Sequence, residues 1–320
     1  MNIEQLSTIL YNHYGDFMKK IKLFVCLVLL LAGCQPQPQT QPQKEETKNT
    51  VSCHFIGDLL YEKPYYDWIE DDSQDKGYYD LVRPYLQNDD LSIANLETPI
   101  GGKELNISGT GYSFNASRDI GEQVASLDLE VVSTANNHAN DRGNQGIDNT
   151  LDFLKEKDIL AVGTYYNQDD RDQGKYMTIH GIKFGFVSYT YATNQIVSDE
   201  NQAKVALFNR PSDRKMTQAY KDLLTKEVTQ TRENCDVLIA MMHWGNEFTY
   251  DISTQQEEVS QLLSDLGVDI IIGNHSHCSQ PMEWINNNRT LCMYSLGNFV
   301  SADPIVDRTH QEFKNAYNVS

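Results

Sequence analysis

Two histidines, His275 and His277, are separated by a single residue and follow an apolar stretch that is typical of a buried strand. Residues 267–272 are rich in valine and isoleucine, so we expect both imidazoles just past the carboxyl end of that strand. Open α/β sheets bind their ligands at this edge. Two imidazoles this close on an irregular backbone can converge on one ion of zinc, manganese, iron or nickel. Taken alone, two histidines at this spacing are more often surface or hydrogen-bonded residues than the ligands of a metal.

Four further sets of polar residues stand in the same context, each where a predicted strand ends. The strand segments are 51–56, 91–96, 129–135 and 237–242, and the polar residues that follow them are Asp58, Glu97, Asn137 with His138, and His243. Taken alone, a carboxylate such as Asp58 is more often a turn residue that caps the next segment. Because functional residues scattered at random would not fall at successive strand ends, we expect all five sets to meet on one polar rim.

The candidate ligands in these sets are carboxylates, an amide and imidazoles, without a thiolate. This mixture suits manganese, iron or zinc better than a structural zinc site, which would use cysteines. Asn137 offers an amide oxygen to a metal, and His138 beside it offers an imidazole for proton transfer. The sequence therefore predicts a divalent-metal centre.

The segments between these sets predict alternating helices and strands. Helical spacing marks residues 120–127, 145–157, 213–233 and 255–266, and further strands are expected at 111–115, 159–163, 176–180, 182–189 and 290–294. Residues 61–80 are aromatic and acidic without a clear period, which favours a loop with a short helix on the outer rim. The alternation indicates a layered α/β fold.

Residues 1–33 predict a segment that is removed rather than folded. Lysines precede residues 23–31, an apolar run too short for an ordinary transmembrane helix, which is typical of a secretory signal peptide with Met18 as the natural start. The sequence Leu-Ala-Gly-Cys that ends at Cys34 resembles a bacterial lipobox. We therefore expect a lipid on Cys34 that anchors the protein to the outer face of the cell membrane. The alternative, a buried core helix, is disfavoured by the Pro/Gln-rich linker at 34–50.

Charge and cysteine content limit the partners and the chemistry. The chain of 320 residues has a net charge of −19, so nucleic acid is an unexpected partner because its phosphates would be repelled. The remaining cysteines, Cys53, Cys235, Cys278 and Cys292, lie mostly in or beside apolar segments and are expected as buried thiols. A bridge between Cys278 and Cys292 is the alternative.

Six short motifs between residue 51 and about residue 304 carry a family resemblance. They are Gly57-Asp58, Asn95-Leu96-Glu97, Ala135-Asn136-Asn137-His138-Ala139, His243-Trp244-Gly245-Asn246-Glu247, Gly273-Asn274-His275-Ser276-His277 with Gln280-Pro281, and Tyr294-Ser295-Leu296-Gly297-Asn298-Phe299. In kind and order they resemble the CapA family of bacterial capsule or poly-γ-glutamate synthesis proteins. That family is similar to the calcineurin-like metallophosphoesterases, which implies a four-layer α/β/β/α sandwich over residues 51–320.

The resemblance also implies roles for the candidate residues. Asp58 would bind one metal, Glu97 would bridge two, Asn137, His243 and His275 would bind the second, and His277 would return to the first. His138 would be the general acid that protonates the leaving oxygen while metal-activated water attacks phosphorus or carbon. Mn, Fe or Zn would fill one or two positions.

Three features depart from the implied pattern. Leu60 stands where the phosphoesterases have a histidine two residues after the first aspartate, which predicts that one metal is poorly held or absent. Glu97 is a methylene longer than the aspartate expected at the bridging position. The chain also ends at Ser320 before the closing strands that the family leads us to expect, as a fragment or a short variant would.

Two functions remain open from the sequence. The first is a lipid-anchored metal-dependent hydrolase or transferase that acts on a phosphoester or an amide-linked anionic polymer. The second is a non-catalytic binding component of a complex for polyglutamate or capsule export. His138 favours the first, because a site without turnover needs no proton donor, and Leu60 favours the second.

Overall fold

The computed structural model describes residues 50–70, 77–110 and 112–302, which all fall within one compact unit, Lys48–Ser320. The expected signal peptide, Cys34, most of the linker and the last 18 residues of the chain, 303–320, lie outside the described residues. No helix among the described residues is both long enough and apolar enough to cross a membrane.

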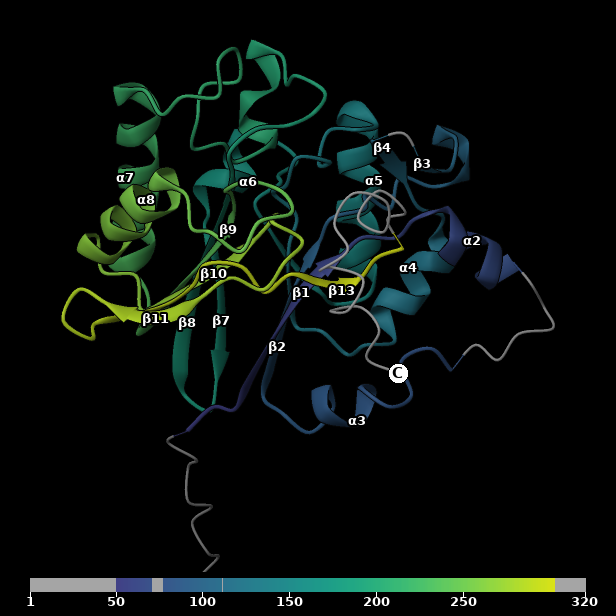
Figure 1. The fold of residues 1–320 in the computed structure, drawn as a ribbon, viewed down its shortest axis with the longest axis horizontal. Helices are drawn as coiled ribbons and strands as arrows, with labels where there is room; N and C mark the ends of the chain where they lie inside the picture. Colours follow the sequence, from purple (N-terminus) through teal and green to yellow (C-terminus); the bar gives the residue numbers. More distant parts are fainter. Residues whose placement is uncertain (1–49, 71–76, 111, 303–320) are drawn as a thin grey trace, which may run out of the picture. The chain divides into compact units, whose positions relative to one another are not determined.

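Two β-sheets form the centre of this unit (Figure 1). The first has the order β13 (Asn298–Val300), β1 (Cys53–Leu59), β2 (Leu91–Leu96), β5 (Val131–Ser133) and β6 (Leu160–Val162), with every pair parallel. The second has the order β11 (Met282–Ile285), β12 (Thr290–Met293), β10 (Ile270–Asn274), β9 (Val237–His243), β8 (Ile182–Thr190) and β7 (Lys175–Ile179). Its four inner strands are parallel and its two edge strands are antiparallel.

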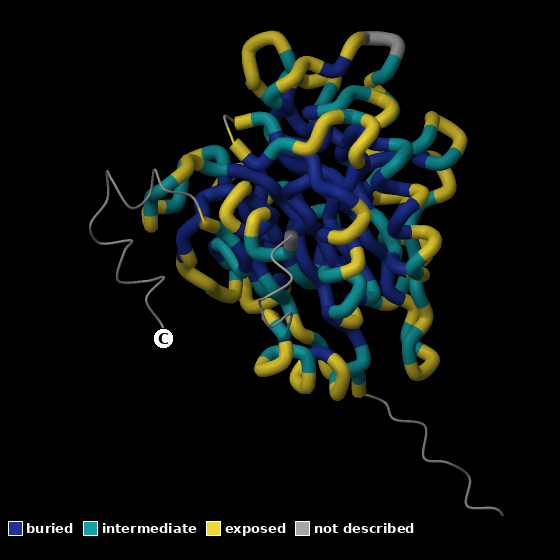
Figure 2. The backbone as a smooth tube through the Cα atoms, turned by 90° about the vertical axis from the view of Figure 1, so that its right-hand side faces the viewer, coloured by how far each residue is buried: buried dark blue, intermediate teal, exposed yellow. Residues whose placement is uncertain are grey.

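Side chains alternate between the two faces of each sheet, as strand geometry requires. On β2, Ile93 faces a buried cluster that it shares with Ile239 and Ile272 of the second sheet, so this cluster fills the space between the sheets. The next residue, Ala94, instead joins a cluster with Ile120 on a helix outside the first sheet. Buried backbone accordingly runs through the interior in Figure 2, and exposed backbone lies mainly at the loops and helices around it.

Helices cover the outer face of each sheet. The first sheet packs against α2 (Lys63–Glu70), α4 (Arg118–Ala125) and α5 (Gly143–Glu156), and the second packs against α7 (Gln218–Arg232) and α8 (Thr254–Asp265). Short elements complete the described chain: α3 (Arg83–Leu86), α6 (Gln168–Asp172), η1 (Lys103–Leu105), η2 (Asp199–Lys204) and the hairpin of β3 (Ser108–Thr110) and β4 (Ser113–Asn115). The fold is therefore the expected four-layer α/β/β/α sandwich.

Three sequence-based expectations need correction. Asp58 lies within β1 and not beyond it, because β1 continues its pairing through Leu59 with both β2 and β13. The aromatic segment is not only rim: Tyr61, Tyr65, Tyr66 and Tyr79 are buried against the first sheet. The strands β11 and β13 were not predicted. Cys53, Cys235, Cys278 and Cys292 are free thiols, which excludes the alternative bridge in this structure.

Candidate metal centre

The six candidate ligands and His138 come together at the carboxyl ends of strands from both sheets. Two sets have ligand atoms that all lie within 4.8 Å of one another. We call Glu97, His243 and His275 the His243 group, and Asp58, Glu97 and His277 the Asp58 group. Glu97 belongs to both groups, and all five residues are at most 7% exposed. Asn137 joins the His243 group through a 2.8 Å contact between its Oδ1 and Nε2 of His243.

Glu97 is the least compensated residue of the centre. Its side chain is fully buried, and neither carboxylate oxygen has a hydrogen-bond partner among the described residues. The nearest imidazole nitrogen in an ion-pair arrangement is Nε2 of His243, at 3.7 Å from Oε1. Burial, followed by the charges of Asp58 and Glu247, raises the pKa of Glu97 well above its usual value. A buried charge left in this state is costly unless a cation compensates it.

Asp58 is better satisfied by its surroundings. Its Oδ1 accepts a 2.7 Å hydrogen bond from Nδ2 of Asn95, and its Oδ2 accepts a weaker one from the backbone N–H of His275 at 3.4 Å. Burial still raises the pKa of Asp58, while His277 and these hydrogen bonds oppose the shift. Gly57, the residue before Asp58, lets β1 lie close to the backbone at Gly297. A Cβ at position 57 would lie 1.8 Å from the carbonyl oxygen of Gly297.

His243 and His275 are buried neutral imidazoles. Burial and the neighbouring histidines lower the pKa of both well below the usual histidine value, which leaves a nitrogen lone pair for a metal. The Nδ1 atom of His275 has no hydrogen-bond partner among the described residues. His243 is fixed by its neighbour Trp244, whose indole N–H donates to the carbonyl of Tyr294 at 2.9 Å.

The loop after β10 holds its histidines in an unusual backbone conformation. His275 has φ 97° and His277 has φ 58°, in the region that favours glycine. Such conformations cost about 1–3 kcal/mol each and cluster at functional sites. Nδ1 of His277 donates to Oδ1 of Asn298 at 2.8 Å, which orients the ring.

His138 has the surroundings of a proton donor. Its Nδ1–H donates to Oδ2 of Asp141 at 2.8 Å, since an ionised carboxylate can only accept. The same carboxylate oxygen accepts the backbone N–H of Phe114 at 2.7 Å, and the Phe114 ring packs edge-on to the imidazole. The Nε2 atom is therefore the one that can exchange a proton with a bound molecule.

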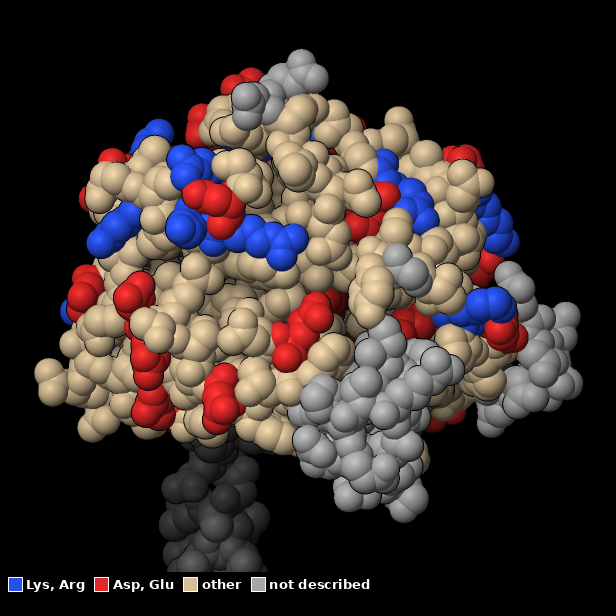
Figure 3. All heavy atoms as spheres, turned by 45° about the horizontal axis from the view of Figure 1, so that its top comes forward, with Lys and Arg blue, Asp and Glu red and all other residues tan. Residues whose placement is uncertain are grey.

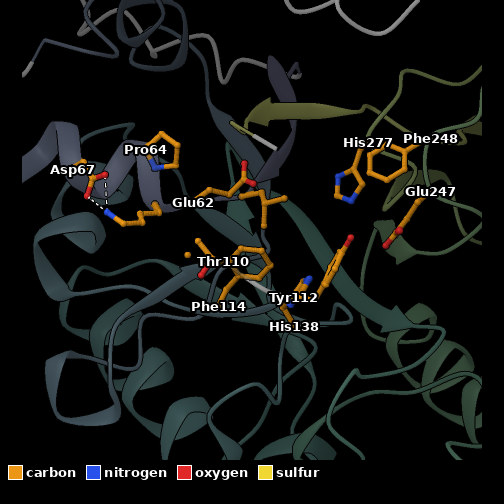
Figure 4. A pocket seen from close by; sticks show the side chains of 13 residues that line it. Glu62, Pro64, Asp67, Thr110, Tyr112, Phe114, His138, Glu247, Phe248 and His277 are labelled. Carbon is orange, nitrogen blue, oxygen red and sulfur yellow. Dashed lines mark hydrogen bonds and ion pairs between the residues drawn. The ribbon is translucent and has the colours of Figure 1, made fainter. Parts of the chain in front are cut away.

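A pocket of about 310 Å³ opens beside the centre (Figure 4). Its lining includes His138, Glu247 and His277, and Asp67 lies on the side opposite His277, where it pairs with Lys63. Apolar residues, among them Leu60, make up much of the remainder. A molecule in this pocket would therefore contact the general-acid candidate and the centre at once.

The donors present fit a divalent metal. The decisive observation is that three buried ligand atoms, both oxygens of Glu97 and Nδ1 of His275, lack a protein partner among the described residues and belong to residues of the converging groups. Buried polar atoms in native proteins are nearly always paired, so an unpaired set of carboxylate and imidazole atoms is what a cation would complete.

Four residues beside the centre were given no role from the sequence. Asn95 holds Asp58, Asp141 holds His138, and Asn298 holds His277. Glu247 forms a further set with His275 and His277 whose ligand atoms lie within 4.8 Å. Each stands inside or next to a motif that the sequence singled out, so motif position was the only signal available for them.

The chain is a four-layer α/β/β/α sandwich with buried ligand groups at the carboxyl ends of its strands. It belongs to the family described as bacterial capsule synthesis protein PGA_cap, whose model matches residues 52–303.

Two curated relatives give the same assignment at the level of family. The chain is 25% identical over 274 residues to the "PGA biosynthesis protein CapA" of Bacillus subtilis (strain 168), covering 82% of this chain and 66% of that protein. It is 25% identical over 289 residues to the "Capsule biosynthesis protein CapA" of Bacillus anthracis, covering 88% of this chain and 67% of that one. The matched part of the chain thus spans about two thirds of the length of these relatives.

Among solved structures, a protein described as a novel phosphatase from Mycoplasma pneumoniae is similar, with 15% sequence identity and a TM-score of 0.47. The likeness covers 78% of this chain and 72% of that one. It is too distant to carry a conclusion about activity.

Proposed function

We propose that this chain is a lipoprotein, anchored through Cys34 to the outer face of the bacterial cell membrane, with a metal-dependent hydrolase site that acts in capsule or poly-γ-glutamate biosynthesis or export. The family assignment supports the biological process. The observation that carries the hydrolase part is the buried Glu97 carboxylate, which is shared by two ligand groups and has no hydrogen-bond partner among the described residues.

Each of the two ligand groups would hold one metal ion. Asp58, Glu97 and His277 would hold one ion, and Glu97, Asn137, His243 and His275 would hold a second. Bound Mn, Fe or Zn would supply Lewis-acid polarisation and an activated water. The protein's own contribution is to exclude bulk water around these residues, which are at most 7% exposed, and to keep His243 and His275 neutral.

His138 would deliver the proton that the leaving group needs. Asp141 keeps the proton of the neutral ring on Nδ1, so protonation to imidazolium puts the transferable proton on Nε2, on the ring that lines the pocket. General-acid catalysis of this kind contributes about 10²–10⁴-fold to a rate. The leaving atom would be the oxygen of a phosphoester or the nitrogen of an amide-linked anionic polymer.

The charge distribution restricts how an anionic polymer would approach. The pocket lining contains three acidic residues, Glu62, Asp67 and Glu247, and one basic residue, Lys63, which pairs with Asp67. The face shown in Figure 3 carries acidic and basic side chains interspersed with uncharged surface. A polyanion would therefore be drawn to the metal ions themselves and to local basic residues.

A non-catalytic binding or assembly role in an export complex is the second candidate, and Leu60 favours it. Leu60 is 4% exposed, lines the pocket beside the Asp58 group and carries no donor atom. A centre with one firmly held ion could bind polymer without cleaving it.

The two roles are separated by measuring metal content and turnover on the same protein. Wild type, His138→Ala and His275→Ala are analysed for bound Mn²⁺, then assayed on phosphomonoester, phosphodiester and poly-γ-glutamate substrates. The hydrolase predicts turnover by wild type, retained metal with lost rate in His138→Ala, and reduced metal in His275→Ala. Bound metal without turnover on any substrate supports the assembly role, and absence of metal from wild type contradicts the proposed centre.

A further inference from the structure

Glu247 stands on the open side of the centre. It follows His243 by four residues in the loop after β9, and it is exposed, unlike the members of the two ligand groups. Its carboxylate forms a third set with His275 and His277, with ligand atoms within 4.8 Å of one another. That set takes His275 from the His243 group and His277 from the Asp58 group. Glu247 is therefore close to one member of each ligand group.

The backbone fastens Glu247 beside these histidines. The N–H of Phe248 donates to the carbonyl of Ser276 at 2.8 Å, and the N–H of Trp244 donates to the carbonyl of Asn274 at 3.2 Å. These two bonds tie the loop after β9 to the loop after β10 on either side of Glu247. The Phe248 ring also stacks on His277, with centroids 5.3 Å apart. The position of Glu247 is thus set by the same segment that carries two ligands.

An exposed glutamate near two imidazoles could be a weak surface interaction without consequence. Two observations argue against this. His275, one of its two neighbours, is 2% exposed and has an Nδ1 atom without a partner among the described residues. Glu247 also adds a further negative charge to a centre that already contains Asp58 and Glu97, an arrangement that is unfavourable without cations.

We propose that Glu247 is a further metal ligand, which closes the centre on the pocket side. The Asp58 group offers only three ligand atoms, and Asp58 already accepts two hydrogen bonds from the protein. Leu60, which also lines the pocket, contributes no ligand atom. A carboxylate from Glu247 would raise the number of protein ligands, which suits hard ions such as Mn²⁺. This inference rests on the proposed metal centre.

The test measures Mn²⁺ binding by calorimetry and the Mn²⁺-induced rise in melting temperature, both independent of activity. Glu247→Gln keeps the size of the side chain and removes its charge. It should weaken Mn²⁺ binding about 10–100-fold, the range found when supporting residues of metal sites are changed. The melting temperature without metal should not fall below the wild-type value, because the residue is exposed and its charge is unfavourable there without cations. Glu247→Asp retains the charge on a shorter side chain, so its Mn²⁺ affinity should lie between those of wild type and Glu247→Gln.

Asp67→Asn is the matched control. Asp67 lines the same pocket and is exposed, but it belongs to none of the three ligand sets. Equal Mn²⁺ affinity in Glu247→Gln and wild type would overturn the inference and leave the proposed function standing. An equal loss in Asp67→Asn would also overturn it, because general pocket charge would then explain the effect. Wild type that binds no Mn²⁺ would overturn the metal centre and this inference together.

Discussion

The two ligand groups share Glu97 but differ in how fully the protein already satisfies their other members. In the His243 group, His243 and His275 are buried with a lowered pKa, and His275 Nδ1 has no partner among the described residues. In the Asp58 group, Asp58 accepts hydrogen bonds from Asn95 and from the backbone of His275. An ion in the His243 group would compete with the 2.8 Å hydrogen bond between His243 Nε2 and Asn137 Oδ1 but with none at His275 Nδ1. An ion in the Asp58 group would compete with both hydrogen bonds that Asp58 accepts. We therefore expect the His243 group to hold its ion more tightly.

Glu97→Gln should have the largest effect, because it removes the charge that both groups share. Metal affinity at both positions should fall by more than about 100-fold, beyond the range for supporting residues. The metal-free variant should be at least as stable as wild type, since wild type must either bind a proton at Glu97 or bury its charge on folding, whereas the neutral amide requires neither. Metal analysis and thermal unfolding with and without Mn²⁺ check both parts. Full metal content in Glu97→Gln would show that the groups do not depend on their shared member.

His138→Gln separates chemistry from metal binding, because His138 belongs to neither group. If the site turns over, the rate should fall about 10²–10⁴-fold while the metal content stays at the wild-type value. Asp141→Asn should give a smaller loss, because it disturbs the hydrogen bonds from His138 Nδ1 and from the backbone N–H of Phe114 but retains the imidazole itself. A loss of metal in His138→Gln would place this residue among the ligands instead.

His243→Ala and His277→Ala each remove one ligand from a single group, the first from the His243 group and the second from the Asp58 group. Calorimetric titration with Mn²⁺ should show two binding phases in wild type. His243→Ala should abolish the tight phase, and His277→Ala should abolish the weak one. In each variant, the Mn²⁺ affinity of the remaining phase should change by less than about tenfold, apart from coupling through Glu97. Loss of the tight phase in His277→Ala would reverse the order of affinities argued above.

Leu60→His adds an imidazole beside the Asp58 group, which we expect to hold its ion more weakly than the His243 group. Leu60 follows Asp58 by two residues and lines the pocket beside His277. The variant should raise affinity in the weak phase by about tenfold, a gain of about 1.4 kcal/mol. The matched control is Leu60→Asn, of similar size but without an imidazole. No change in the weak phase of Leu60→His would mean that the side chain cannot reach the ion.

The smallest effect is expected in the metal-free protein as pH changes. Burial raises the pKa of Glu97 above its value in the unfolded chain, so folding favours the protonated form. Its contribution to stability is therefore present below the ordinary glutamate pKa and is lost as pH rises toward the raised value. Compared with wild type, metal-free Glu97→Gln should lose less stability between about pH 5 and about pH 8. Chemical unfolding at the two pH values measures the difference, and parallel curves would contradict it.

The sequence was informative where one segment carried both an apolar run and its polar end. The strand before His243 was predicted to within one residue, and the strand before His275 and the helices α5 and α8 were predicted to within a few residues. Their local periodicity is strong, and the carboxyl ends of parallel strands share an edge. Convergence of distant strand ends followed from that general rule.

The sequence was uninformative where a role depends on a partner far along the chain. β13 has only three residues, and it is a strand because it pairs with β1, more than 200 positions earlier. The same is true of Asn95 and Asn298, whose positions beside Asp58 and His277 arise from strand register and loop geometry. The burial of Tyr61 and Tyr79 likewise depends on helices that pack against them from elsewhere in the chain. Residues 61–80 show no clear period, and they were therefore wrongly predicted to lie on the outer rim.

Diffraction from crystals grown with Mn²⁺, measured at the manganese absorption edge, would locate the ions of the proposed centre. We expect an anomalous peak within bonding distance of Glu97 and His243, with a second, weaker peak between Glu97 and Asp58. Peaks only at surface carboxylates, with Glu97 left uncoordinated, would contradict this expectation.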